Sequence, residues 1–274
     1  MNSNEKIRVW WWSERNTRFW WFPRKSGKEN FGDVLTPYLT EKISGKKAVF
    51  THINHPLKPP THFIIGSILA RVRPHCIVWG SGILQSKEQV AKADFRAVRG
   101  PMTRKRLTEL GYQVPEVYGD PALLLPRYYK AKTAKKYALG IIPHYVDYER
   151  IVKEVQDENI KIINLFDSVE KVVEEVCSCE RIISSSLHGV IVSQAYQIPA
   201  IWVKLSNKLS GDDIKFSDYF LSVGIEPYKP LEFKTTPIDF KAIAPHIKEK
   251  NKYNVIQHDL ENISDTLLKN CPFL

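Results

Sequence analysis

A histidine that directly follows a short apolar strand is the side chain with the clearest potential for chemistry. In the segment RIISSSLHGVIV the strand pattern ends near Ser184, and Ser185 or Ser186 can cap the helix that follows. His188 then lies in the first helical turn, beyond the carboxyl end of a strand, where open α/β sheets bind ligands. The alternative is a buried histidine that only satisfies neighbouring polar groups.

The predicted helix start affects the charge of His188. A helix N-terminus disfavours imidazolium by roughly 0.3–1 kcal/mol. A phosphate about 4 Å away favours imidazolium by about 4 kcal/mol at an effective dielectric constant of 20. A phosphorylated substrate would therefore protonate the ring on binding, as a general acid requires.

One basic side chain near a predicted strand end is a candidate for holding an anion. Arg99 follows the strand FRAV, and its planar guanidinium suits phosphate and carboxylate groups better than an ammonium does. The alternative is a salt bridge between elements.

Asp33 and His144 follow two further predicted strands. The glycine of NFGD permits a tight turn, and Asp33 is predicted to begin the helix that follows. Its carboxylate could act as a general base, orient a substrate or simply cap the helix. His144 follows YALGII, and Pro143 restricts its approach, so we assign it to binding or to a structural hydrogen bond. The loop Gly80–Gly82 could present N–H groups to an anion, whereas Asp120 before a proline is typical of a cap or turn.

The elements that must position these residues alternate between strands and helices. Helix patterns begin after Gly100, with Pro101 in the first turn, and at the predicted N-caps Asp147 and Asp167. Such alternation predicts a mostly parallel sheet covered by helices on both faces. The predicted strands are RVWWW, KAVF, HFIIG, HCIVWG, FRAV, YALGII, IKIINL, RIISS and AIWV.

The chain is long enough for two Rossmann-like lobes that face each other across a cleft. Hydrophobic patterning lapses and basic residues accumulate in 126–137. We therefore expect a first lobe over 1–134, a second over 135–225, and a helical tail over 226–274 that packs back against the first lobe.

The composition narrows the classes of function. A net charge of +10 fits nucleic acid, an anionic membrane or an acidic substrate, but no nucleic-acid-binding signature accompanies the dispersed lysines. Four scattered cysteines and the lack of a signal peptide or long apolar segment predict a cytoplasmic protein that does not span a membrane. No metal-ligand cluster is evident, so we expect no metal and no cofactor.

Six motifs, taken in order, resemble the polysaccharide pyruvyl transferases along nearly the whole chain. They are NFGDVLTPYL, GSGIL, VRGPMTRKRL, YGDPALLLP, GIIPHYVDYER and ISSSLHGVIVSQAYQIPAIWV. The resemblance implies a B-type glycosyltransferase-like fold, with the acceptor on the first lobe and the donor on the second. It also implies transfer of pyruvate from phosphoenolpyruvate, a co-substrate, onto two hydroxyls of a hexose as a ketal.

The resemblance assigns roles to the candidate residues. His188 and Asp33 would be catalytic. Many relatives have arginine where this chain has Ser186, so Arg99 and Lys215 are the candidates to replace its phosphate contact. Lys215 is a candidate because relatives often have a lysine in the stretch that corresponds to GDDIKFSDYF; the alternative is a solvated surface lysine. The residues expected to bind the donor are Arg99, Lys215, His144, Ser186 and Gly189.

The acceptor is expected to be a lipid-linked or nucleotide-linked glycan precursor, bound by Asn30, Trp20 and Trp21. These tryptophans could stack on a sugar or, with nearby arginines, touch an anionic membrane, which would place the protein peripherally at the inner membrane face. Core packing is the structural alternative.

Three other functions remain open. A B-type glycosyltransferase that uses a nucleotide sugar would need the same lobes and the same anion-binding cleft. A non-catalytic ligand-binding member of a polysaccharide assembly complex would explain the departure at Ser186. Nucleic-acid binding rests on charge alone.

Overall fold

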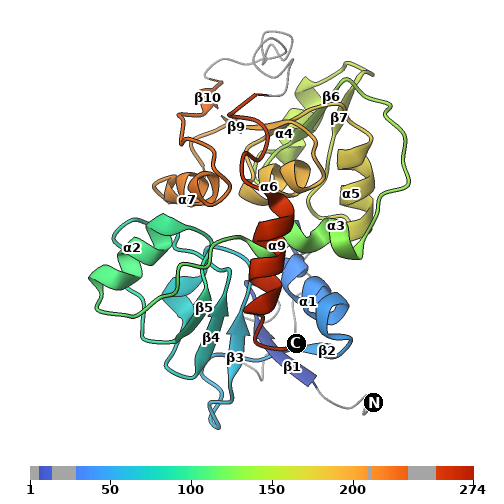
Figure 1. Cartoon of the computed structure of the whole chain (residues 1–274). Helices are drawn as coiled ribbons and strands as arrows, with labels where there is room; N and C mark the ends of the chain where they lie inside the picture. Colours follow the sequence, from blue (N-terminus) through green and yellow to red (C-terminus); the bar gives the residue numbers. More distant parts are fainter. Residues whose placement is uncertain (1–5, 14–28, 209–210, 234–250) are drawn as a thin grey trace.

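The fold combines two parallel β-sheets, each flanked by α-helices. The structure is a computed structural model that describes residues 6–13, 29–208, 211–233 and 251–274. Figure 1 shows the second sheet above the first in its view, with the C-terminal helix crossing in front of the first sheet. The α/β class predicted from alternating strand and helix patterns is confirmed.

The first sheet has five parallel strands in the order β2-β1-β3-β4-β5. Its strands are β1 (Lys6–Trp10), β2 (Lys47–Phe50), β3 (Thr61–Phe63), β4 (Cys76–Trp79) and β5 (Asp94–Ala97).

The second sheet has five parallel strands in the order β10-β9-β8-β6-β7. Its strands are β6 (Leu139–Ile142), β7 (Ile160–Ile162), β8 (Ile182–Ser184), β9 (Ala200–Lys204) and β10 (Leu231–Glu232). All nine predicted strands form. The tail predicted to be helical contains one further strand, β10, whose two residues are too few to show an alternating pattern in the sequence. The expected boundaries at 134 and 225 stay predictions.

Each sheet repeats one doubly wound strand order, 2-1-3-4-5 when its own strands are counted along the chain. In such sheets the strand order reverses between the first and third strands, and ligands bind beyond the carboxyl ends of the strands at this switch point. In the first sheet this point lies between β1 and β3, and in the second between β6 and β8. The fold therefore predicts sites after Trp10, Phe63, Ile142 and Ser184.

Among the helices that flank the first sheet, α2 is the one whose start and end the sequence marks clearly, and both are found as predicted. α2 starts at Pro101 and is followed by Gly111 with φ +86°, as the sequence predicts. The helical elements here are α1 (Phe31–Ser44), η1 (Leu69–Arg71), α2 (Pro101–Glu109), η2 (Pro121–Leu124) and α3 (Leu125–Tyr128).

The second part corrects one predicted helix start. α5 has Ser168 rather than Asp167 as its N-cap, because the Ser168 side chain accepts the N–H of Lys171 while Asp167 pairs with the Lys171 ammonium. Asp147 is the N-cap of α4, but its side chain makes no capping hydrogen bond. The helices are α4 (Tyr148–Glu154), α5 (Val169–Cys177), α6 (Leu187–Ala195), α7 (Ile214–Ser222) and α9 (Leu260–Lys269).

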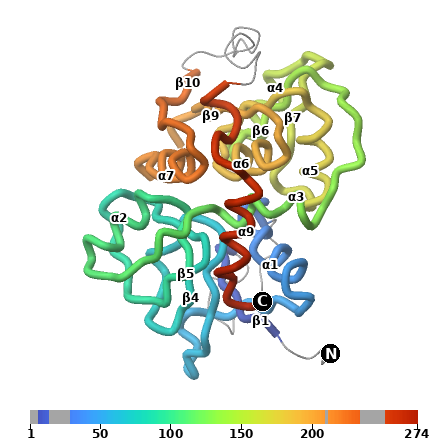
Figure 2. The backbone as a smooth tube through the Cα atoms, viewed as in Figure 1, coloured from blue at the N-terminus to red at the C-terminus, as the bar shows by residue number. Residues whose placement is uncertain are grey.

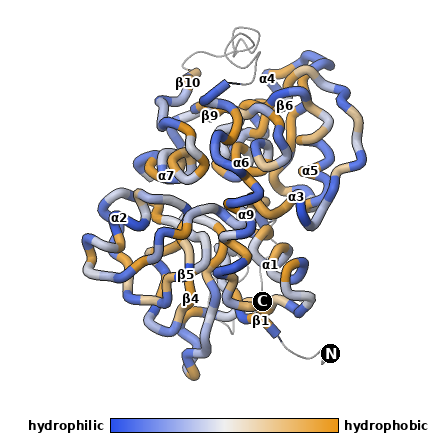
Figure 3. Tube along the Cα trace, viewed as in Figure 1, coloured by the Kyte–Doolittle hydropathy of each residue, from blue (hydrophilic) through white to orange (hydrophobic). Residues whose placement is uncertain are grey.

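One hydrophobic core extends across both parts of the chain. It joins α1 residues such as Leu35 to α6 residues such as Val190, and Figure 3 shows the apolar stretch of α6 in the middle of the second part. α9 passes along the chain's front in Figure 2 and packs on the first sheet, where Trp79 Nε1 donates to the Leu267 carbonyl at 2.9 Å. The final helix therefore packs back against the first part, as the sequence predicts.

Candidate active site

His188 projects from the first turn of α6 toward the start of α1. α6 begins at Leu187, as predicted, and the His188 side chain is only 12% exposed. A Cβ atom on Gly32 would lie 2.2 Å from His188 Nδ1. Gly32 is therefore required by the close approach of the imidazole, and the two helix starts meet at this ring.

Asp120 is a carboxylate that lies within ion-pair distance of His188. Its Oδ2 lies 3.4 Å from His188 Nε2, an ion-pair distance at which neither atom has a hydrogen-bond partner in the described part of the chain. Its Oδ1 accepts the N–H of Ala122 at 3.0 Å, so the predicted capping role is confirmed. Asp120 is fully buried, and a buried carboxylate beside an imidazole can orient the ring and stabilise imidazolium.

The pairing of Asp120 with His188 is the feature that the sequence alone did not predict. Asp120 follows the isolated bridge between Val98 and Tyr118, at the carboxyl side of the first sheet. The signal in the sequence was its place in YGDPALLLP, two residues after Tyr118 and directly before a proline. Only the packing of η2 against α6 brings it to the histidine.

Asp33 lies in the first turn of α1 rather than at its N-cap. The helix begins two residues earlier, at Phe31, because Asn30 takes the extended N-cap conformation and Phe31 N–H is held by the Leu165 carbonyl at 2.8 Å. Asn30 Nδ2 lies 3.4 Å from Asp33 Oδ2, a weak hydrogen bond, while Asn30 Oδ1 is buried without a partner among the described residues. Asp33 lies close enough to His188 for the two charges to interact.

Burial raises the pKa of Asp33 to about 7, although His188 and the Asn30 amide act in the opposite direction. A carboxyl group that titrates near neutral pH can both accept and return a proton under working conditions. The charge of the His188 ring interacts with this carboxyl group. This pair therefore has the properties of a proton-transfer site.

His144 follows β6 at the switch point of the second sheet, and Lys215 of α7 lies close enough to it for their charges to interact. Both side chains are half-buried. Burial, helped by the Lys215 ammonium, lowers the pKa of His144 to about 4, and Asp147 partly offsets this effect. Burial and the nearby Arg99 guanidinium also lower the pKa of Lys215. His144 is therefore neutral at pH 7, and an incoming anion would relieve the repulsion among these groups.

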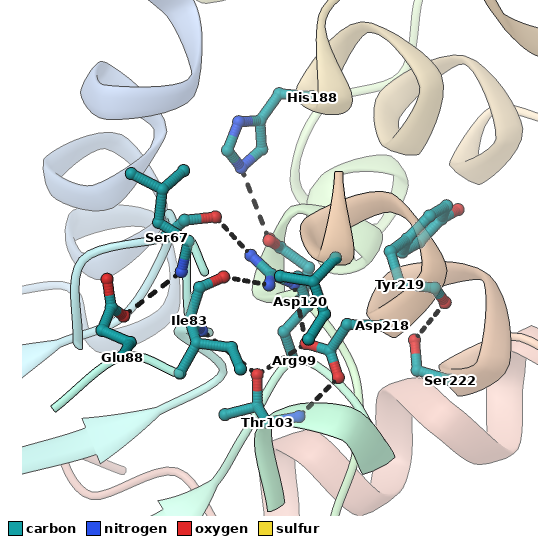
Figure 4. A network of polar contacts seen from close by, with 12 residues as sticks. Ser67, Ile83, Glu88, Arg99, Thr103, Asp120, His188, Asp218, Tyr219 and Ser222 are labelled. Atoms are coloured by element: carbon teal, nitrogen blue, oxygen red, sulfur yellow. Dashed lines mark hydrogen bonds and ion pairs between the residues drawn. The ribbon is translucent and has the colours of Figure 1, made fainter. Parts of the chain in front are cut away.

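Arg99 is held in a fully buried ion pair rather than exposed at a crevice. Its Nε donates to Asp218 Oδ2 at 3.0 Å and its Nη1 to Ser67 Oγ at 2.6 Å (Figure 4). Its Nη2 donates to the Ile83 carbonyl at 2.7 Å. The salt bridge between elements, one of the two interpretations of Arg99, is therefore present, and donor binding by Arg99 stays a prediction.

Asp218 connects α7 to the first part of the chain. It also accepts the N–H of Thr103 at 2.8 Å and the Thr103 hydroxyl at 2.7 Å. A Cβ atom on Gly100 would lie 1.9 Å from the Asp218 carbonyl oxygen, so the two backbones nearly touch. This joint fixes α7, which carries Lys215, against the start of α2.

The serine and glycine of SSLHG serve the local fold. Ser186 is the N-cap of α6 but makes no capping side-chain hydrogen bond, and its N–H is accepted by Ser184 Oγ at 3.0 Å. Ser185 does not cap α6 either, since its Oγ accepts the His144 N–H at 2.8 Å. A Cβ atom on Gly189 would lie 2.3 Å from Ser184 Oγ, so Gly189 permits close packing on β8.

The Gly80–Gly82 loop does not offer the N–H groups expected of it. Gly80 N–H is accepted by the Ala97 carbonyl at 2.9 Å and Gly82 N–H by the Gly66 carbonyl at 3.0 Å. Gly82 instead allows the guanidinium of Arg99 to pack against the backbone. The loop supports the ion pair, and the anion-binding hypothesis for these two groups is wrong.

A cavity of about 520 Å³ opens between α1 and the start of α5. Its walls combine carboxylates with aromatic rings, a lining that suits sugar hydroxyls and sugar faces. Glu29 belongs to this lining and also contributes to the field at Asp33. The acidic and aromatic residues of the cavity are Glu29, Tyr38, Glu41, Phe166, Asp167 and Glu170.

The chain matches a known family over the region that carries this site. The model of the polysaccharide pyruvyl transferase family matches residues 30–207. The chain belongs to the polysaccharide pyruvyl transferase family. The matched region contains Asp33, Asp120 and His188, whereas Lys215 lies outside it.

Two curated proteins are similar to the chain. The chain is 32% identical over 206 residues to the uncharacterized protein L143 of Acanthamoeba polyphaga mimivirus, with 72% of each chain covered. It is 26% identical over 236 residues to the succinoglycan biosynthesis protein ExoV of Rhizobium meliloti (strain 1021), covering 78% of this chain and 67% of ExoV. No solved structure matches the chain significantly.

Membership in the polysaccharide pyruvyl transferase family supports a pyruvyl transferase of polysaccharide biosynthesis. Trp20 and Trp21, predicted to bind the acceptor, lie outside the described residues. Among the residues that the structure describes, no three His, Cys, Asp or Glu side chains are grouped to hold a metal ion. Over the same residues, no helix has the length and apolar character needed to cross a membrane.

Proposed function

We propose that this family member transfers pyruvate from phosphoenolpyruvate onto two hydroxyls of a hexose in a polysaccharide precursor and forms a pyruvate ketal. The observation that carries the proposal is the convergence of His188, Asp33 and Asp120 where the starts of α1 and α6 meet. Two interacting groups that can exchange protons near neutral pH are what two hydroxyl additions need.

The reaction proceeds in two additions. His188 donates a proton to the methylene carbon of phosphoenolpyruvate while a sugar hydroxyl adds to the neighbouring carbon, and Asp33 accepts the proton of that hydroxyl. Phosphate then leaves, and the second hydroxyl adds to the same carbon. One hydroxyl proton is thus balanced by the new methyl group and the other leaves with phosphate.

Asp120 acts on this reaction through His188. Its buried carboxylate, 3.4 Å from Nε2, favours the protonated imidazole and fixes the direction of the ring. The phosphate of the donor adds to this effect, because it also places negative charge near the ring. Asp120 is therefore a positioning residue and His188 the acid.

The donor is held by positive groups at the second switch point. Lys215 binds the phosphate or carboxylate, and neutral His144 donates or accepts a hydrogen bond. The first-turn N–H groups of α6, which have no intrahelical acceptor, serve the same anion beside Ser186 and Gly189. Arg99 contributes through its charge while its hydrogen bonds stay with Asp218, Ser67 and Ile83.

The acceptor glycan lies along the cavity between α1 and α5, with Asn30 at its inner end. In this arrangement the two sheets with their helices are the lobes of a B-type glycosyltransferase-like fold, the first for the acceptor and the second for the donor. The glycan is lipid-linked or nucleotide-linked and is met in the cytoplasm, at the inner membrane face when it is lipid-linked.

Calorimetry with two donors tests the proposal. The purified chain is titrated with phosphoenolpyruvate and, separately, with nucleotide sugars, and is then incubated with phosphoenolpyruvate and galactose, mannose or acetylated hexosamine glycosides. We expect phosphoenolpyruvate to bind and to yield a ketal and free phosphate. Binding of nucleotide sugars alone would favour a glycosyltransferase, and phosphoenolpyruvate binding without turnover would favour a non-catalytic protein.

A further inference from the structure

A second cavity, of about 450 Å³, lies at the amino ends of β3 and β4. The loops that form it precede these two strands and lie at the lower end of Figure 1, away from α6 and α7. It is therefore remote from the site of His188. The lining that bears on its chemistry is His55, Pro56, Lys58, Arg73, Pro74 and His75.

Among the described residues, no carboxylate lines this cavity. The sequence contains no aspartate or glutamate between Glu41 and Glu88, so the two loops that form the cavity carry none. Lys58 forms no ion pair within the described residues, and Arg73 Nη1 donates only to the carbonyls of Arg71 and Val72, at 3.3 and 2.9 Å. Two positive charges thus share one cavity without a neutralising partner in the described chain.

The imidazoles of the cavity can donate hydrogen bonds into it. His55 Nδ1 accepts the N–H of Leu57 at 3.2 Å, which leaves its Nε2 to carry the proton. His75 Nε2 is buried and has no partner among the described residues. Burial, together with the charges of Lys58 and Arg73, lowers the pKa of His75.

The backbone holds Lys58 in a conformation that lysine seldom adopts. Its φ is +44°, in the left-handed region, and its N–H is accepted by the His55 carbonyl at 2.9 Å. A strained position persists only when its surroundings impose it. The turn 55–58 therefore presents its histidine and its lysine to the cavity in a fixed arrangement.

We propose that this cavity is a binding site for a phosphate-bearing anion, separate from the site of pyruvyl transfer. A phosphate group accepts the hydrogen bonds of His55 and His75 and neutralises Lys58 and Arg73 together. Leu57 beside the cavity is 84% exposed, so a phosphate that projects from a lipid surface could bring apolar chains against it. The ligand is thus a soluble phosphomonoester or the phosphate of an anionic lipid.

Histidine-ring NMR of the full chain tests the site without interference from phosphate bound at His188. The signals of His55 and His75 are assigned with the variants His55→Asn and His75→Asn and are followed during titration with glycerol phosphate. We expect both rings to shift with one shared saturation curve. The double variant Lys58→Gln/Arg73→Gln should weaken this binding by about tenfold or more.

A matched control removes the same net charge elsewhere. Lys105 on α2 and Lys153 on α4 are both exposed, and the double variant Lys105→Gln/Lys153→Gln should leave the His55 and His75 titration unchanged. If the rings do not shift with glycerol phosphate or with lipid, or if both double variants weaken binding equally, the site does not exist.

Vesicles distinguish the two sources of phosphate. Cosedimentation is measured with phosphatidylcholine vesicles that contain or lack phosphatidylglycerol, using the wild type, the cavity double variant and Leu57→Ser. Binding that needs phosphatidylglycerol, Lys58, Arg73 and Leu57 supports a lipid phosphate. Saturable glycerol phosphate binding without vesicle binding supports a soluble ligand.

Discussion

His188 Nε2 lies 3.4 Å from Asp120 Oδ2. The contact links α6, which follows β8 of the second sheet, to the residues that follow the first sheet. Because neither atom has another hydrogen-bond partner within the described ranges, the pair is held together by charge and packing. The candidate site thus draws on both sheets: in the proposed reaction the acid, His188, follows the second sheet and the carboxylate that orients it, Asp120, follows the first.

Asp120→Asn should lower kcat by roughly 10²-fold or more, because the imidazolium loses its carboxylate partner. The loss should appear in kcat rather than in KM for phosphoenolpyruvate, a split that a merely structural role would not produce. Asp94→Asn, which changes an exposed carboxylate, is the control. A wild-type kcat in Asp120→Asn would contradict the proposed role of Asp120.

Gly32→Ala should displace the His188 ring, since the added Cβ would lie 2.2 Å from Nδ1. Misplacement of a reacting group by about 1 Å can cost roughly 10²-fold in rate. Alanine is the better helix former by roughly 0.5–1 kcal/mol, so thermal stability should not fall enough to explain the loss. Activity and melting temperature are measured on the same preparation, and wild-type turnover would contradict the close approach.

Asp33→Asn should change how stability depends on pH. The pKa of Asp33 is raised from 3.8 to about 7, so the folded chain binds this proton more tightly than the unfolded chain. The stability due to Asp33 is thus fully present below the unfolded pKa and is lost as pH rises through the folded pKa. Between about pH 5 and about pH 8 the melting temperature of the wild type should therefore fall more than that of Asp33→Asn. Parallel curves would contradict the raised pKa.

Asp218→Ala should be strongly destabilising, because it leaves the guanidinium of Arg99 buried without its counter-ion. Loss of one partner of a buried pair costs about 3–5 kcal/mol. Asp94→Ala breaks the exposed pair with Arg96 and should cost at most about 1 kcal/mol. Urea denaturation compares the two variants, and equal costs would show that the buried pair adds nothing.

The residues at strand ends could be predicted because strand and helix patterns are local. The carboxyl end of β8 at Ser184, the start of α6 at Leu187 and the position of His188 all follow from the pattern of one segment. The start of α1 was predicted two residues late, since a tertiary contact of Phe31 with Leu165 fixes it.

The partners of the site residues could not be predicted, because they come from distant parts of the chain. Asp120 reaches His188 only when η2 packs on α6, and Asp218 reaches Arg99 only when α7 packs on α2. The sequence shows an arginine after a strand but not whether it is free. The fold determines that it is buried.

Product analysis with His188→Ala tests the central claim most directly. Wild type and variant are incubated with phosphoenolpyruvate and an acceptor glycoside, and ketal and phosphate are quantified by NMR. The account predicts one phosphate per ketal in the wild type and a loss of both by roughly 10²–10⁴-fold in the variant, with little change in melting temperature. Ketal formation by His188→Ala at the wild-type rate would contradict it.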